Sequence, residues 1–182
     1  MVIALVPVGN SKRLKNKHFL EFCGKRIIDA VIDNLEETGA FSRIIVYSHA
    51  DIRVKNAEVI RDERLEGVLP LIFDAIRRYG ENVFVLGGDM PLANRSSILP
   101  LLSYPEQLSV VPRWRNGYME PLHSLYSTSC INYEPEGRSI NRFIERIPRI
   151  YFPAEDLPPN AFFNVNTQED YERLKNLCRG NL

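Results

Sequence analysis

The stretch Val2–Lys17 reads VIALVPVGNSKRLKNK. Its first part, Val2 to Pro7, is a short apolar run typical of a strand that is buried on both faces of a parallel sheet. The loop signal Gly9-Asn10-Ser11 ends this run, and the loop that follows carries four cations, with no acidic residue before Glu21. Ligands of parallel α/β sheets bind beyond the carboxyl ends of the strands. The stretch therefore predicts a buried first strand with a concentrated positive patch at its end.

Strand and helix patterns alternate through the first hundred residues. Apolar residues at helical spacing predict a helix over 27–35, which Gly39 would end as a C-terminal cap, and a second helix over 69–76. Short β-branched or aromatic runs predict strands at 43–48, 58–60 and 82–86. Such alternation is typical of a parallel, doubly wound sheet, so a ligand site is expected in the loops after Pro7 and Leu86.

The pattern loosens beyond Pro100. It predicts short strands at 108–112, 122–126 and 150–152 and a helix over 139–147. Thr167 and Asp170 fit a capping motif for a last helix that runs to Leu177. We see no linker and no repeat, and 182 residues suit a single α/β domain with a mostly parallel sheet flanked by helices.

Composition narrows the classes of function. Lys plus Arg equals Asp plus Glu, at 23 each, so no net field would attract nucleic acid or an anionic membrane to the whole surface. The N-terminal apolar run is too brief to span a bilayer, and it lacks the basic leader of an exported protein. Cys23, Cys130 and Cys178 are odd in number and widely spaced, which favours three reduced thiols over a zinc site or a disulfide framework. We therefore expect a cytoplasmic protein.

The basic loop suits a triphosphate. Backbone N–H groups from Gly9 to Ser11 and fixed charges at Arg13 and Lys17 would lie at the carboxyl end of the first strand. The alternative is a solvated basic loop without a ligand. A Walker loop and a Gly-x-Gly-x-x-Gly fingerprint are both missing from the sequence, which disfavours the two common nucleotide-binding folds.

A second candidate segment is Gly87-Gly88-Asp89-Met90-Pro91-Leu92. Its carboxylate follows a buried strand, and Pro91 fixes the backbone that leaves it. Mg²⁺ prefers one or two carboxylates together with substrate phosphate oxygens, so Asp89 is a candidate Mg²⁺ ligand. The alternative is an aspartate that only caps the turn.

Three further features carry weaker signals. Asn164 and Asn166 alternate on an extended segment, so both side chains would point to one face, where they could complete a metal or phosphate site or merely bond a loop. Trp114 lies in a basic aromatic loop that could stack on a flat ring or form a surface turn. The histidines are separated in sequence and show no ligand or triad spacing, so we interpret each as structural; they are His18, His49 and His123.

Three segments together resemble the molybdenum cofactor guanylyltransferases, which are MobA-like nucleotidyltransferases. They are Gly88–Leu92 (GDMPL), Glu120–Tyr126 (EPLHSLY) and Phe163–Asp170 (FNVNTQED), in the family's order and at about its spacing. The resemblance spans nearly the whole chain. It implies a single-domain Rossmann-like nucleotidyltransferase fold over 1–182, with an NTP-binding half at 1–100 and an acceptor-binding half at 101–182. The implied reaction transfers GMP from GTP to molybdopterin, with Mg²⁺ as cofactor and pyrophosphate as the second product.

The resemblance also implies roles for individual residues. Asp89 would hold Mg²⁺, and Asp89, Arg13 and Lys17 would be the catalytic residues. The implied nucleotide-binding residues are Val8, Gly9, Asn10, Ser11, Lys12, Arg13, Lys17, Asp62, Gly67 and Asp89. Arg138, Asn164 and Asn166 would bind the acceptor.

Two regions depart from the family pattern. Val8 stands where the family usually has a glycine, and Ser11–Lys17 looks like the loop of sugar-acid cytidylyltransferases. In the segment expected to recognise the base, Val68 and Leu69 replace a Gly-Pro pair. The alternatives are therefore a cytidylyltransferase for a sugar acid, a guanylyltransferase for another phosphorylated cofactor precursor, and a nucleotide-binding protein without turnover. The sequence does not set the oligomeric state.

Overall fold

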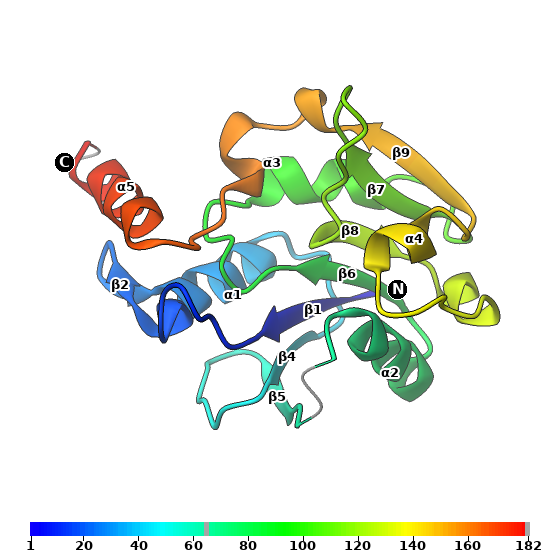
Figure 1. The fold of residues 1–182 in the computed structure, drawn as a ribbon, viewed down its shortest axis with the longest axis horizontal. Helices are drawn as coiled ribbons and strands as arrows, with labels where there is room; N and C mark the ends of the chain where they lie inside the picture. The colour runs from blue at the N-terminus through cyan, green and yellow to red at the C-terminus, as the bar shows by residue number, and fades with distance from the viewer. Residues whose placement is uncertain (64–65, 181–182) are drawn as a thin grey trace.

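The computed structural model describes residues 1–63 and 66–180 and contains one large sheet between two layers of helices (Figure 1). Seven strands lie in the order β5-β4-β1-β6-β8-β7-β9. Their bounds are β1 Val2–Val8, β4 Ile44–Ser48, β5 Glu58–Arg61, β6 Asn82–Leu86, β7 Ser109–Arg113, β8 His123–Tyr126 and β9 Arg149–Pro153. Strand β8 is antiparallel to its neighbours, and the other pairings are parallel. The predicted mostly parallel sheet is confirmed.

The helices cover both faces of this sheet. Their bounds are α1 Ile27–Glu37, α2 Leu69–Tyr79, α3 Arg95–Ile98, α4 Ile140–Ile144 and α5 Gln168–Gly180, with 3-10 turns η1 Lys17–Phe19, η2 Leu99–Leu102, η3 Thr128–Asn132, η4 Ala154–Asp156 and η5 Pro159–Phe162. Alternate residues of β1 point to opposite faces: Ala4 and Val6 pack on the α1 side, whereas Ile3 and Leu5 pack on the side of α2 and α4. The apolar run is continuous because both faces are covered.

The seven strands of the large sheet are those expected from the sequence, with boundaries that move by at most one residue. The helix predicted over 139–147 is shorter, Ile140–Ile144, with Ser139 as its N-cap. Pro148 disfavours helical backbone at the residue before it, and β9 begins at Arg149, so the helix cannot continue. Gly39 follows the end of α1 with a positive φ of 63°, in agreement with the expected cap. Thr167 and Asp170 cap α5 as expected, since each side chain accepts a hydrogen bond from the other's backbone N–H.

A short hairpin, β2 Glu21–Phe22 with β3 Lys25–Arg26, was not expected from the sequence. It packs beside α5, on the left of Figure 1. A small third core lies here, in which Ile27, Val165 and Leu174 are fully buried. Partly buried apolar residues of the N-terminal loop, among them Leu14 and Leu20, pack against it. This core joins the N-terminal loop to α5 near the C-terminal end of the described chain.

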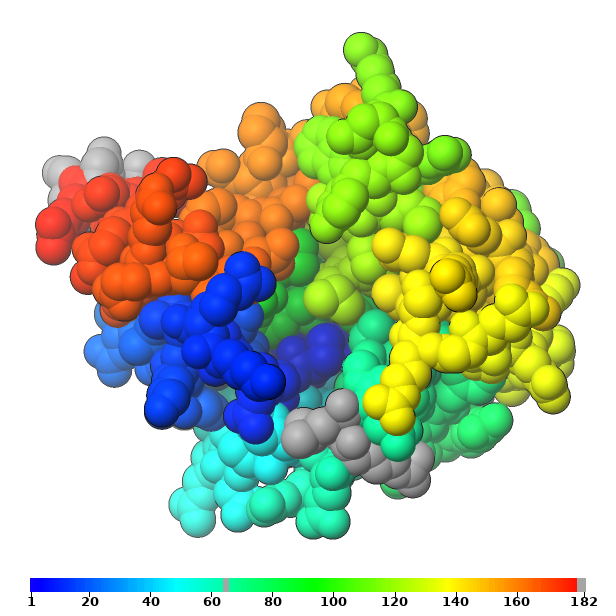
Figure 2. Space-filling model, viewed as in Figure 1, coloured from blue at the N-terminus to red at the C-terminus, as the bar shows by residue number. Residues whose placement is uncertain are grey.

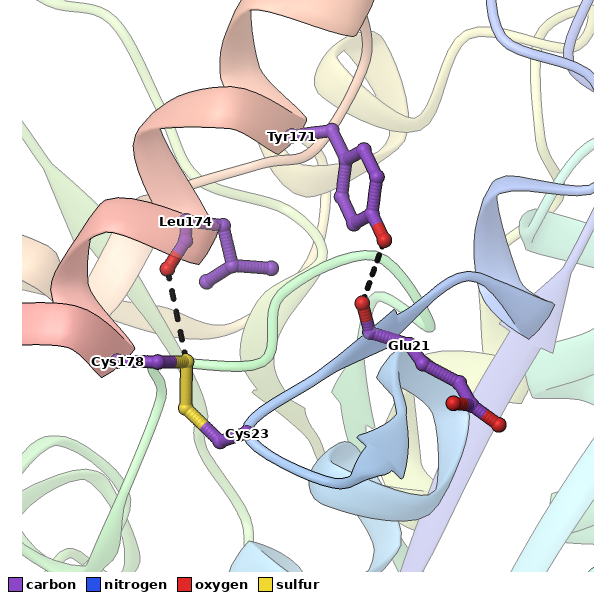
Figure 3. The surroundings of a disulfide bond; sticks show 5 residues. All are labelled: Glu21, Cys23, Tyr171, Leu174 and Cys178. Carbon is purple, nitrogen blue, oxygen red and sulfur yellow. Dashed lines mark hydrogen bonds between the residues drawn. A yellow bond between two sulfur atoms is a disulfide. The ribbon is translucent and has the colours of Figure 1, made fainter.

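A disulfide between Cys23 and Cys178 links the hairpin to α5 (Figure 3), across a sequence separation of 155 residues. Beside it, the Tyr171 hydroxyl donates a hydrogen bond to the Glu21 carbonyl. The prediction of three reduced thiols is therefore wrong for Cys23 and Cys178, and only Cys130 is a free, buried thiol. Spacing rules detect cysteines that pair locally, whereas these two meet only after the chain has folded. The thiol count thus gives no support for a reducing compartment.

None of the helices in the described ranges is both long enough and apolar enough to cross a membrane.

We expect the disulfide to stabilise the fold. A cross-link over 155 residues restricts mainly the unfolded chain, and disulfides typically contribute about 2–4 kcal/mol. Reductant should therefore lower the Tm of the wild-type protein by roughly 5–15 °C. Cys178→Ser should melt at the lower temperature with or without reductant, as measured by calorimetry. A wild-type Tm that does not respond to reductant, or three titratable thiols in the unfolded and unreduced chain, would contradict this expectation.

Candidate active site

A pocket of about 550 Å³ opens at the carboxyl ends of β1, β4 and β6. Figure 2 shows the hollow, with the N-terminal segment (blue) on one side and segments of the second half of the chain (green and yellow) on the other. The pocket lies where ligands of parallel α/β sheets usually bind. Of the residues proposed for nucleotide binding, those that line it are Val8, Gly9, Asn10, Lys17, Asp62, Gly67 and Asp89.

Lys17 and Asp89 form an ion pair at the wall of this pocket. The distance from Lys17 Nζ to Asp89 Oδ2 is 2.6 Å, and the same Nζ donates to Asn166 Oδ1 at 3.0 Å. The two charged side chains are only 11% and 15% exposed. Asn166 belongs to the segment before α5, and the N–H of Val165 donates to the Asp89 carbonyl at 2.9 Å. Three segments that are distant in sequence therefore meet at one point.

The glycines before Asp89 allow this segment to lie directly against β1. A Cβ at Gly88 would stand 2.9 Å from the Pro7 carbonyl oxygen and 3.1 Å from His18 Cδ2. A Cβ at Gly87 would stand 2.9 Å from Asp89 Oδ1. Backbone atoms cannot move away from such contacts without shifting the strand. Side chains at these positions would push the carboxylate away from Lys17.

The donor set fits Mg²⁺ better than a metal that needs a complete protein cage. Across 1–63 and 66–180, no three His, Cys, Asp or Glu side chains gather in a way that could hold a metal ion. Within the same ranges, Asp89 Oδ2 bonds to Lys17 while Oδ1 accepts no hydrogen bond. Mg²⁺ is commonly held by one or two carboxylates, with the remaining ligands from water and substrate phosphate. Asp89 could hold Mg²⁺ in that way once a nucleotide is bound.

The two asparagines of the FNVN segment flank Val165, whose side chain is fully buried. Only Asn166 reaches the ion pair directly. Asn164 is partly exposed and is not among the residues that line the pocket.

Several residues of the basic loop lie away from the pocket. The Ser11 hydroxyl accepts a hydrogen bond from the Leu14 N–H, which shapes the loop. Lys12 and Arg13 are exposed and do not line the pocket. Arg138 is also exposed, although Ile140, two residues later, does line the pocket. Ser11, Lys12, Arg13 and Arg138 are therefore close in sequence to residues of the site, but they do not line the pocket.

Two histidines that we interpreted as structural line the pocket, namely His18 and His49. His49 Nδ1 donates to the Val8 carbonyl at 3.1 Å, because a carbonyl can only accept. The pKa of His18 is lowered to about 4, mainly because the ring is buried. The ring is therefore neutral at pH 7. His123 is fully buried, and its Nε2 donates to the Ser97 carbonyl, as expected for a structural histidine. A separation of 31 residues between His18 and His49 hid their proximity in the sequence.

Trp114 lies outside the main pocket. Its indole N–H donates to Glu120 Oε1 at 2.9 Å, and its ring meets Phe162 edge to face. Burial raises the pKa of Glu120. A separate surface depression includes Trp114 together with Arg113 and Tyr151. The indole is thus partly used in packing, although one side of it remains at the surface.

The chain is similar to known proteins over most of its length. Residues 8–146 match the family of the MobA-like NTP transferase domain. A protein of Pyrococcus furiosus, named probable molybdenum cofactor guanylyltransferase, is 36% identical, and the match covers 98% of this chain and 99% of that protein. The protein of the same name from Thermococcus kodakarensis is 32% identical, with 96% and 94% covered.

Two solved structures share the fold. Molybdopterin-guanine dinucleotide biosynthesis protein A from Archaeoglobus fulgidus has a TM-score of 0.75 at 23% identity, covering 99% of this chain and all of that one. CMP:2-keto-3-deoxy-manno-octonic acid synthetase, complexed with CTP, also has a TM-score of 0.75, at 16% identity, covering 100% and 99%. The expected nucleotidyltransferase fold is confirmed. The match to the family model and the identity to the Pyrococcus protein over nearly the full length show that this chain belongs to the MobA-like NTP transferases.

Proposed function

We propose that this protein is a Mg²⁺-dependent guanylyltransferase that transfers GMP from GTP to molybdopterin and releases pyrophosphate. The observation that carries the proposal is the contact of Lys17 with Asp89 and Asn166 at the pocket. It unites a cation for phosphate, a carboxylate for Mg²⁺ and an amide from the second half of the chain. We propose guanine and molybdopterin because the relatives from Pyrococcus and Thermococcus are named probable molybdenum cofactor guanylyltransferases.

The reaction is an in-line displacement at the α-phosphorus. An oxygen of the acceptor's terminal phosphate forms the new P–O bond, the α–β bridging P–O bond breaks, and its electron pair leaves with pyrophosphate. Such transfers need positioning and charge stabilisation more than covalent work by the protein. When bound, Mg²⁺ would supply charge neutralisation at the phosphates.

This chain's own residues would share the remaining work. Asp89 would hold the cation, and the ammonium group of Lys17 would neutralise the departing pyrophosphate. The backbone N–H groups near Gly9 and Asn10 would contact phosphate oxygens from the end of β1. Asp62 and Gly67 line the part of the pocket beyond β4, where we place the base.

A cytidylyltransferase is the second candidate. The loop Ser11–Lys17 resembles that of sugar-acid cytidylyltransferases, and a CTP complex of one such synthetase shares the fold of this chain. The fold alone therefore does not separate guanine from cytosine.

The Tm of the protein in the presence of each NTP identifies the preferred nucleotide. A ligand that binds only the folded state, present at 100 times its Kd, stabilises by about 2.7 kcal/mol. In Mg²⁺ we expect GTP to raise the Tm more than ATP, CTP or UTP at the same concentration. A larger shift with CTP would favour the second candidate. If GTP binds but no pyrophosphate appears with molybdopterin or other phosphorylated acceptors, the protein would be a nucleotide-binding protein without turnover.

Asp89→Asn keeps the shape of the side chain and removes its charge. Turnover with Mg²⁺ should fall by about 100-fold or more, the typical loss for one preorganised electrostatic contact. Pyrophosphate release from GTP in the presence of molybdopterin measures the effect. Asp33→Asn is the matched control, because Asp33 is a partly exposed carboxylate whose ion pair with Lys25 lies outside the pocket. Near wild-type turnover of Asp89→Asn would exclude the carboxylate from the mechanism.

Lys17→Met keeps the length of the side chain and removes the ammonium group. A hydrogen bond to a charged group contributes about 1.5–3 kcal/mol, so the KM for GTP should rise roughly tenfold or more. Steady-state kinetics of this variant are compared with those of Lys25→Met, which removes a half-exposed lysine of β3. An unchanged KM for GTP would count against a phosphate-binding role for Lys17.

A further inference from the structure

His18 is a buried histidine that makes no hydrogen bond to the residues the structure describes. Its side chain lies in η1 and only 5% of the residue is exposed. Within the described ranges, neither ring nitrogen of His18 makes a hydrogen bond, whereas His49 and His123 each have a carbonyl partner. A ring nitrogen that makes no hydrogen bond within the chain remains able to donate to or accept from a ligand.

The ring nitrogens of His18 are unpaired within the described residues but are not fully enclosed. Among the described residues, the fully enclosed and unpaired side-chain atoms are His123 Nδ1 and Arg149 Nε, and neither nitrogen of His18 is one of them. His18 lines the pocket at the carboxyl end of β1. A ligand in that pocket could therefore reach the ring.

The ring is also held in place. Its Cδ2 atom lies beside Gly88, where an added Cβ would stand only 3.1 Å away. The preceding residue is Lys17, whose ammonium group is fixed by Asp89 and Asn166. The ring packs against Gly88, in the turn before Asp89. A buried ring in this position is preorganised for a ligand that binds at the phosphate end of the pocket.

We propose that His18 is a nucleotide-binding residue whose ring N–H donates a hydrogen bond to the β- or γ-phosphate of the bound NTP. This inference rests on the proposed function and adds a contact to it. An oxygen of the phosphate chain would then satisfy the nitrogen that has no partner in the folded chain alone.

Two substitutions test this role. His18→Leu fills the space and removes the donor, and His18→Gln retains a side-chain N–H of similar reach. Calorimetric titration in Mg²⁺ measures the Kd for GTP and for GMP, which lacks the β- and γ-phosphates. We expect His18→Leu to weaken GTP roughly tenfold and GMP by less than about twofold, and His18→Gln to recover most of the GTP affinity. The Tm of His18→Leu should stay close to that of the wild type, because the ring makes no hydrogen bond within the described residues and leucine fills much of its volume.

The outcomes separate this inference from the proposed function. If wild-type protein binds GTP and His18→Leu binds it equally well, or if GTP and GMP weaken by the same factor, the role of His18 is wrong and the proposed function stands. A lower Tm of His18→Leu with unchanged GTP affinity would assign His18 to packing alone. If the wild type binds none of the four NTPs, the proposed function fails and this role fails with it.

Discussion

The ion pair between Lys17 and Asp89 is the interaction on which the candidate site depends. Both side chains are mostly buried, so each charge would be costly without the other. They meet because β1 and β6 are adjacent parallel strands, and the loops that follow such strands emerge at the same edge of the sheet. The apolar patterns that build the two strands therefore also bring a cation and a carboxylate together.

A third segment closes the site from the far end of the chain. Asn166 reaches Lys17 because the neighbouring Val165 is held in place. The Val165 N–H donates a hydrogen bond to the Asp89 carbonyl, and the Val165 side chain is buried in the small third core. The same core receives apolar residues of the N-terminal loop, and the disulfide ties the hairpin after η1 to α5. The segments that carry Lys17 and Asn166 are thus each anchored just beyond the site, which restricts the motion of both side chains relative to Asp89.

Much of this arrangement follows from local sequence. Strands and helices could be predicted because a run such as 82–86 or a spacing such as 27–35 carries its own periodicity, and the position of Asp89 follows from the strand before it. What could not be predicted depends on contacts distant in sequence, such as the pairing of Cys23 with Cys178. The directions of exposed loop side chains are a second feature that local sequence leaves open. Charge alone does not say which cation of a loop points inward: Lys17 is held by Asp89, whereas Arg13 has no such partner in the described chain and lies outside the pocket.

The charge at the pocket explains why a divalent cation suits this site. Lys17 is the one Lys or Arg side chain among the described residues that line the pocket, and Asp89 already neutralises it. A bare triphosphate would therefore meet a wall without net positive charge, since Asp62 and Asp89 both line the pocket with Lys17. A divalent cation held by Asp89 would compensate that carboxylate and leave the ammonium group free to pair with phosphate, so metal and nucleotide should bind cooperatively. Neutral donors such as backbone N–H groups and His18 can then orient the phosphate chain without adding charges that repel Lys17.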